Sequence, residues 1–171
     1  RSPKAKTVQA HQGAVNALLA VPHSNSVFSG GEDRELRRWN VSDGSQQRTG
    51  LPVGAAITSL ALGPNDRLAV GDSDGTTTVF RLEVRAPLWS IKDEARDKPV
   101  AAIHSIAFTS EPNRFVTASS DGFLRVLNLP QSPPFVYLPD HDAAITALAW
   151  SPDGKFGLTA GAERSLRLYD M

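Results

Sequence analysis

The sequence predicts an all-β fold: a β-propeller of four-stranded antiparallel blades, with about four blades present. A four-residue phrase that begins with alanine and a β-branched residue recurs at residues 14–17, 56–59, 102–105 and 144–147, and its second positions lie 42, 46 and 42 residues apart. After each copy, apolar residues alternate with small or polar ones, a period near two that is typical of strands. We find no sustained helical period in the 171 residues, so we expect no long helix.

Each period of the sequence holds four short strands. The first is the alternating run, expected at residues 15–19, 57–62, 103–108 and 145–150. A turn rich in Pro, Asn, Asp and Gly leads to the second strand, at 26–29, 67–70, 114–117 and 155–159. After a turn of small residues that ends in an acid, the third strand closes on a bulky residue: Trp39, Phe80, Leu127 or Tyr169. A weaker fourth strand precedes the phrase, at 7–10, 46–49, 88–91 and 135–138.

The repeats set the domain organisation. One such sheet cannot bury its own faces, so neighbours must stack, and stacking around an axis gives a propeller. We expect a basic, disordered tail at residues 1–6 and four repeats at about 7–45, 46–87, 88–134 and 135–171. A charged insertion at 92–101 explains the longer middle spacing, and a proline-rich connection at 130–134 precedes the last repeat.

The motifs inside the first repeat resemble those of the WD-repeat family. His11 stands at the histidine of the family's Gly-His pair, Ser29 in the second strand, Asp33 in the following turn and Trp39 at the tryptophan of the Trp-Asp pair. The resemblance implies a buried hydrogen-bonded network among these four side chains. Their donors and acceptors can satisfy one another, because indole only donates, carboxylate only accepts and serine does both.

The other copies keep parts of this pattern. The matching residues are His141, Thr159, Glu163 and Tyr169 in the fourth copy, Thr117 and Asp121 in the third, and Asp74 in the second. The second copy has Val70 and Phe80 at two network positions. We therefore expect no complete network there.

Four repeats are about half of a ring. Propellers of the resembled family usually close with seven blades, sometimes six or eight, and each repeat takes about 40–45 residues. Four blades would leave two apolar blade faces uncovered, and the last blade would lack its fourth strand, leaving an unpaired edge. We expect part of a seven- or eight-bladed ring, completed by the rest of the same protein, by a second chain or by a homodimer of half-rings.

The resemblance also implies a face on which a protein or peptide partner docks. It is made by the loops before the first strand and between the second and third strands. Interface hot spots favour large side chains, so an alanine at the start of every phrase indicates that this half of the ring is not the main hot spot. One hypothesis is that Arg34 and Arg164 form a small basic site for an acidic peptide where two half-rings adjoin, and the alternative is that both are solvated surface residues. The face residues are Ala14, Asn16, Glu32, Arg34, Ala56, Thr58, Ser73, Ala102, His104, Ser120, Ala144, Thr146 and Arg164.

Composition narrows the function classes. The net charge is zero, which argues against general attraction to nucleic acid or to anionic membranes. There is no cysteine, and no apolar run approaches the ~20 residues that span a bilayer. The acids at Asp72 and Asp74 lack the remaining ligands of a calcium loop, so we expect a tight turn capped by carboxylates. We find no catalytic constellation and expect no metal or cofactor.

These observations favour a non-catalytic protein–protein interaction scaffold within a larger protein or assembly. The alternatives are a regulatory or sensor propeller domain of a multidomain enzyme and a subunit of a nucleic-acid-associated complex, which the zero net charge disfavours. No signal peptide is visible, and we expect an intracellular protein, cytoplasmic or nuclear.

Overall fold

A computed structural model describes residues 5–82, 86–92, 101–111, 113–130, 135–139, 141–151 and 153–170. The regular structure in these residues is entirely β, as the alternating period predicts. Residues 1–4 of the expected tail, 93–100 of the charged insertion and 131–134 of the proline-rich connection lie outside the described residues. The end of the tail is described, and there Lys6 Nζ donates a hydrogen bond to the Asp43 carbonyl. The expected disorder of residues 1–6 stays a prediction.

The strands form four antiparallel sheets, which we call blades 1 to 4. Blade 1 comprises β1 (Val15–Ala20), β2 (Ser26–Gly31), β3 (Glu35–Asn40) and β4 (Gln46–Pro52). Blade 2 comprises β5 (Ile57–Gly63), β6 (Arg67–Asp72), β7 (Thr76–Arg81) and β8 (Pro87–Lys92). Blade 3 comprises β9 (Ile103–Phe108), β10 (Arg114–Ser119), β11 (Phe123–Asn128) and β12 (Phe135–Pro139). Blade 4 comprises β13 (Ile145–Trp150), β14 (Phe156–Gly161) and β15 (Leu166–Asp170).

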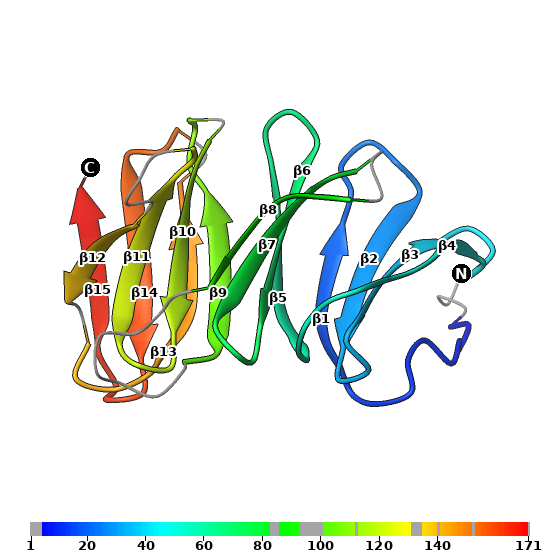
Figure 1. Cartoon of the computed structure of the whole chain (residues 1–171), viewed down its shortest axis with the longest axis horizontal. Helices are drawn as coiled ribbons and strands as arrows, with labels where there is room; N and C mark the ends of the chain where they lie inside the picture. Colours follow the sequence, from blue (N-terminus) through cyan, green and yellow to red (C-terminus); the bar gives the residue numbers. More distant parts are fainter. Residues whose placement is uncertain are drawn as a thin grey trace.

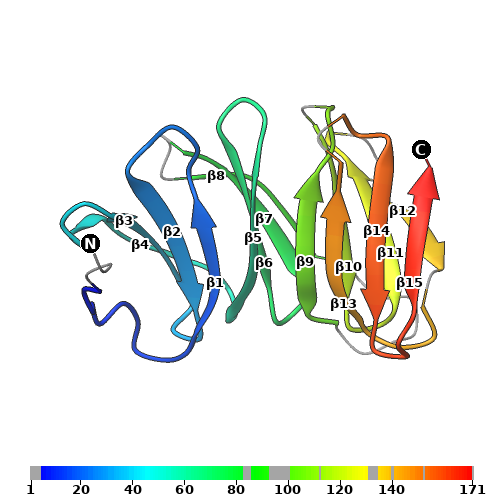
Figure 2. The same ribbon diagram turned by 180° about the vertical axis from the view of Figure 1, so that it is seen from behind.

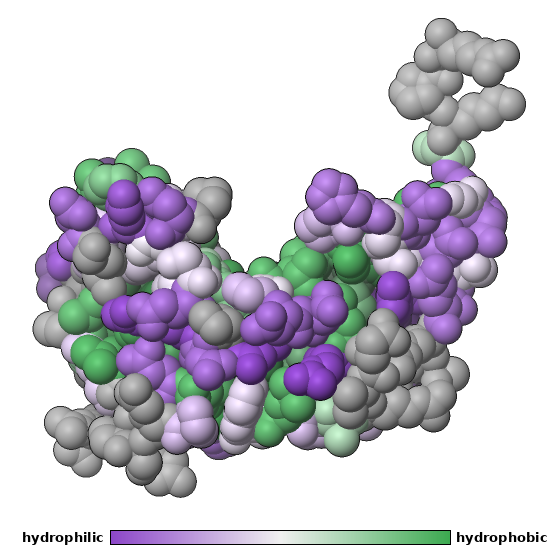
Figure 3. All heavy atoms as spheres, turned by 90° about the horizontal axis from the view of Figure 1, so that it is seen from above, coloured by the Kyte–Doolittle hydropathy of each residue, from purple (hydrophilic) through white to green (hydrophobic). Residues whose placement is uncertain are grey.

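The blades follow one another along an arc rather than around a closed ring (Figures 1 and 3). The first strand of each blade contacts the first strand of the next, from β1 through β5 and β9 to β13. These strands line the concave side, which faces the viewer in Figure 2. The arrangement is a partial β-propeller, as the repeat spacing predicts.

The prediction of a strand at residues 7–10 is wrong, because this segment has no regular structure. A strand needs a partner for its backbone hydrogen bonds, and blade 1 is already a four-stranded sheet without it. The other three weak strands are present as β4, β8 and β12. Each pairs with the third strand of its own blade, which comes from the preceding sequence repeat. The sheets are therefore offset by one strand from the sequence repeats.

The hydrophobic core lies between the blades. One cluster joins Phe28 and Leu36 of blade 1 to Leu68 of blade 2, a second joins blades 2 and 3, and a third joins blade 3 to Ile145 of blade 4. Close approach needs small residues on the second strands. A Cβ on Gly30 would lie 2.8 Å from the Cβ of Ile57 in the next blade, well inside contact distance.

Candidate protein-interaction face

The loops expected to bind a partner all lie on the same rim of the arc, the lower edge in Figure 1, and this rim runs from blade 1 to blade 4. In every blade, the alanine before the first strand accepts a backbone hydrogen bond from the turn between the second and third strands. The donor and acceptor residues are Glu32 and Ala14 (3.0 Å), Ser73 and Ala56 (2.9 Å), Ser120 and Ala102 (3.0 Å), and Ala162 and Ala144 (2.9 Å). The face is thus a set of four tied loop pairs.

Two residues expected on this face form hydrogen bonds to the neighbouring blade. Asn16 Nδ2 donates to the carbonyl of Ile57, 3.1 Å away, and Thr58 Oγ1 donates to the carbonyl of Ile103. Both bonds cross from one blade to the next, so these side chains hold the arc together at its concave side. His104 occupies the same position in β9 and is exposed. Thr146 instead bonds within blade 4, to the carbonyl of Ala160 at 3.1 Å.

Arg34 and Arg164 are exposed and adopt left-handed backbone conformations, with φ of 64° and 70°. Blades 2 and 3 carry Gly75 and Gly122 at this turn position, with φ of 81° and 82°. The turn therefore demands a positive φ, which costs an L-residue roughly 1–2 kcal/mol more than glycine. The two arginines lie in blades 1 and 4, at opposite ends of the arc, so the structure does not bring them together.

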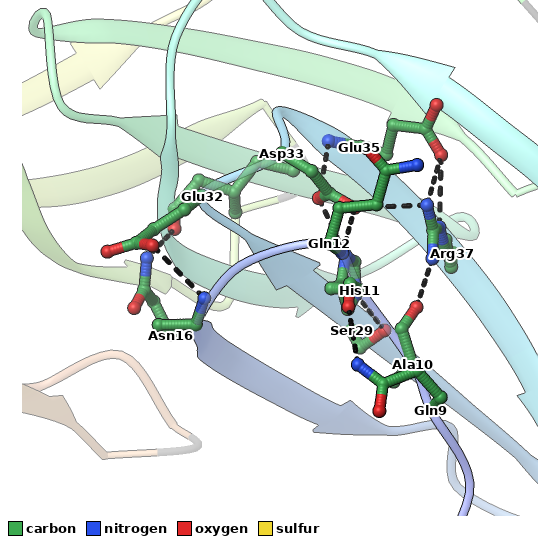
Figure 4. Close-up of polar contacts among 12 residues, drawn as sticks. Gln9, Ala10, His11, Gln12, Asn16, Ser29, Glu32, Asp33, Glu35 and Arg37 are labelled. Carbon is green, nitrogen blue, oxygen red and sulfur yellow. Dashed lines mark hydrogen bonds and ion pairs between the residues drawn. The ribbon is translucent and has the colours of Figure 1, made fainter.

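The side chains behind the face in blade 1 form one hydrogen-bonded chain (Figure 4). His11 Nδ1 lies 2.7 Å from Asp33 Oδ1, and His11 Nε2 lies 2.6 Å from Ser29 Oγ. Trp39 Nε1 donates to the same Ser29 oxygen at 2.7 Å. Since the indole only donates and the carboxylate only accepts, the serine hydroxyl donates to Nε2 and the proton of a neutral histidine sits on Nδ1.

The Asp33 carboxylate is the negatively charged group of this network. Burial alone would raise its pKa. The hydrogen bonds that it accepts from His11 and from the Gln12 and Glu35 amides hold the pKa below its usual range. Arg37, from β3, also pairs with Asp33 at 3.0 Å. The acid therefore fixes the loop before β1 to the turn after β2.

Blade 4 repeats this arrangement with longer residues. His141 contacts Glu163 through Nδ1, and its Nε2 lies 2.8 Å from Thr159 Oγ1. Hydrogen bonds from Ser165 and His141 lower the pKa of Glu163 to about 2. Tyr169 packs against the apolar cluster between blades 3 and 4.

Blade 3 uses other residues for the same task. Asp121 accepts hydrogen bonds from Ser119 Oγ at 2.6 Å and from the Phe123 amide at 3.0 Å, and it pairs with Arg125. Burial would raise the pKa of Asp121, but the bonds from Arg125, Ser119 and Phe123 keep it below its usual range. Thr117 is buried in β10, opposite Arg125 in the sheet register.

Blade 2 has two acids. Asp74 pairs with Lys92 of β8 at 2.8 Å. Asp72 is fully buried, and its Oδ1 accepts the Asp74 and Thr76 amides at 3.2 and 2.8 Å. Burial, with the nearby Asp74 carboxylate, raises the pKa of Asp72 to about 7. Among the described residues, no hydrogen-bond partner reaches Asp72 Oδ2, and a carboxylate oxygen buried in this way favours the neutral, protonated form.

A steric rule explains why these networks differ. Gly31 and Gly161 precede the turn acid by two residues in the blades that carry the histidine. A Cβ on Gly31 would lie 3.0 Å from His11 Nδ1 and 2.7 Å from the Ala14 carbonyl, so the ring and a side chain there exclude each other. Blades 2 and 3 carry Asp72 and Ser119 at this position, and both side chains are buried. In blade 3 Ser119 donates a hydrogen bond to the turn acid, as histidine does in blade 1.

The sequence interpretation missed the arginine partners. Arg37 and Arg125 each follow the turn acid by four residues, which puts both on the face of the third strand that looks toward the acid. The signal was present as an acid with arginine four positions later in three of the four copies. The sequence near Asp74 does not indicate its partner, because Lys92 lies on the neighbouring strand β8.

Within the described residues, no helix is long and apolar enough to cross a membrane. A search of the same residues finds no group of His, Cys, Asp and Glu that could hold a metal ion.

Comparison with known proteins assigns the class. The family model for the WD domain, G-beta repeat, matches residues 2–40, 97–128 and 132–170, more than half of the chain. The chain therefore belongs to the WD-repeat family, whose members are generally protein-interaction scaffolds. The matched segments leave out β5 to β8. In this blade Lys92 pairs with the turn acid Asp74, and Asp72 stands at the position of Gly31 in blade 1.

Curated relatives cover nearly all of the chain. It is 28% identical to the ribosome biogenesis protein WDR12 homolog of Chlamydomonas reinhardtii, over 89% of this chain and 36% of the relative. It is 27% identical to actin-interacting protein 1 of Drosophila melanogaster, over 94% of this chain and 26% of that protein. The chain thus spans only about a quarter to a third of these relatives.

Proposed function

We propose that this chain is a non-catalytic protein–protein interaction scaffold, and that its blades are part of a larger propeller. The names of the relatives point to different assemblies, ribosome biogenesis in one case and actin in another, so no single partner follows from similarity. The proposal rests on the surface of blade 4.

The observation that carries the proposal is an exposed apolar face of blade 4, on which no other blade of the described residues packs. In blade 3, Leu124 and Val126 are 0% and 2% exposed because blade 4 covers them. Leu166 and Leu168 stand at the same positions of blade 4 and are 69% and 74% exposed. Phe156 and Leu158 lie on the neighbouring strand and are also exposed. Covering one leucine would contribute about 1.5–3 kcal/mol.

The opposite end of the arc shows the same feature. Leu18 of β1 is 70% exposed, whereas Ile106, at the same position of β9, is 7% exposed against blade 2. Both ends of the arc therefore present blade-packing surfaces, as a segment of a ring would. We propose that further blades cover them, supplied by the rest of the same protein, a second chain or a second copy.

We further propose that Arg34 and Arg164 contact an acidic partner. Both are kept in a conformation that suits glycine, and strain of this kind is often associated with function. We expect the double substitution Arg34→Gly and Arg164→Gly to leave stability unchanged or raise it by up to about 1 kcal/mol, because glycine relieves the positive φ. Partner capture, measured by quantitative mass spectrometry, should fall.

The matched control is Lys155→Ala, which removes an exposed positive charge from the turn at the other end of β14. It should leave capture unchanged. Equal capture by the wild-type chain and the arginine double variant would show that the two arginines are solvated surface residues.

A further inference from the structure

Blade 2 lacks the arginine that its neighbours use. Four residues after the turn acid, blades 1, 3 and 4 carry Arg37, Arg125 and Arg167, whereas blade 2 carries Thr78. In blades 1 and 3 the guanidinium group at this position pairs with the turn acid. Asp74 is therefore the turn acid of blade 2, but the arginine that pairs with this acid in blades 1 and 3 is replaced by Thr78.

A hollow of about 570 Å3 lies where that side chain would be, within the range of roughly 300–1,000 Å3 that is common for ligand pockets. One wall is apolar and comes from Leu51 and Val53, at and after the end of β4. The other wall is the facing side of β7 and β8, where Thr76 pairs with Lys92 and Thr78 with Ser90 in the sheet register.

The polar groups of this hollow suit a guanidinium ion. Asp74 supplies a carboxylate, and the hydroxyls of Thr76, Thr78 and Ser90 supply oxygens that can accept from the five N–H donors of arginine. Apolar walls suit the aliphatic stem of the side chain.

The ion pair that Lys92 forms with Asp74 can be replaced by another cation. The Lys92 and Asp74 side chains are 49% and 41% exposed, and exposed ion pairs of this kind contribute little. Arg125, by comparison, is 3% exposed beside its acid. An incoming arginine could displace the lysine ammonium group from the acid at small cost, because the displaced group is exposed and can be solvated.

We propose that this hollow between blades 1 and 2 binds an arginine side chain of a partner protein, with its guanidinium group paired to Asp74 in the place that Arg125 occupies in blade 3. The site adjoins the loop face, because Asp74 lies in the turn between β6 and β7. It includes neither Arg34 nor Arg164, so either proposal can fail without the other.

The test uses acetyl-Ala-Arg-Ala-amide as the probe, titrated into the isotopically labelled chain and followed by NMR. The backbone amides of Thr76, Thr78 and Ser90 should shift. The peptide with citrulline in place of arginine keeps the shape but loses the charge, and it should bind at least about tenfold more weakly. Equal shifts with the two peptides would overturn the proposal.

Three variants should change the affinity for the peptide in different directions. Thr78→Arg supplies the missing side chain from within, so it should abolish peptide binding and raise the unfolding temperature. Asp74→Asn should weaken binding by about tenfold or more, and Lys92→Ala should tighten it by removing the competitor. If Thr78→Arg does not fold, the other two still decide: unchanged affinity in both would overturn the proposal.

Discussion

Replacing Arg125 by methionine should destabilise the chain by about 3–5 kcal/mol, because it leaves the Asp121 carboxylate buried without its counter-charge. The two side chains are 3% and 5% exposed. Methionine keeps the packing of the aliphatic stem against Phe123 and Tyr137, over whose rings the guanidinium group lies. Chemical denaturation of both proteins at neutral pH measures the effect.

Two further variants separate charge from packing. Adding Asp121→Asn to Arg125→Met should recover much of the loss, because a neutral amide still accepts from Ser119 and the Phe123 amide. Arg37→Met in blade 1 should cost less, since Arg37 is 15% exposed and Asp33 keeps His11. A loss below about 1 kcal/mol for Arg125→Met would mean that the pair is no more than a surface ion pair.

Asp72→Asn should stabilise the chain above neutral pH by about 1–3 kcal/mol, because it removes a fully buried carboxylate that has no ion-pair contact among the described residues. The pKa of Asp72 is raised from 3.8 to about 7 in the folded chain. Between these values the folded state holds a proton that the unfolded state has released. Wild-type stability should therefore fall as pH rises through this window and level off above it.

The charged groups that act on Asp72 are Asp74, in the turn after β6, and Lys92 on β8. The pKa of Asp74 is lowered, so its contribution is lost only as pH falls below the unfolded value, outside this window. Unfolding curves across the window should be flatter for Asp72→Asn than for the wild type. Asp153→Asn is the control, because an exposed acid with a lowered pKa should not change the slope there. Parallel curves for the wild type and Asp72→Asn would contradict this account.

The fold could be predicted from the sequence because its signals are local and repeated four times. Alternation marks β5 and β13, and turn residues separate the strands. The four-residue network of blade 1 was also predictable, since His11, Ser29, Asp33 and Trp39 are the residue types of one hydrogen-bonded chain. The strand expected at residues 7–10 failed because no neighbouring sheet edge is there to pair with it.

The site in blade 2 could not be predicted, because it depends on contacts between segments far apart in the sequence. Nothing local shows that Asp72 is fully buried, or that Lys92 reaches Asp74 from another strand. Val53, three residues before the alanine of its phrase, stands where blade 1 has His11, and it packs into the core between blades 1 and 2. Asn16 was expected on the partner-binding face, yet its amide is already bonded to the next blade.

Light scattering over a range of concentrations tests most directly whether the ends of the arc are interaction surfaces. The 171-residue chain has a mass of 18.3 kDa. We expect it to associate, because the blade 4 face exposes Leu166 and Leu168, and because β15 is an edge strand of its sheet within the described residues. Leu168→Glu should reduce the association, since a charge cannot be buried there without a partner. A stable, monodisperse monomer at all concentrations would contradict the account.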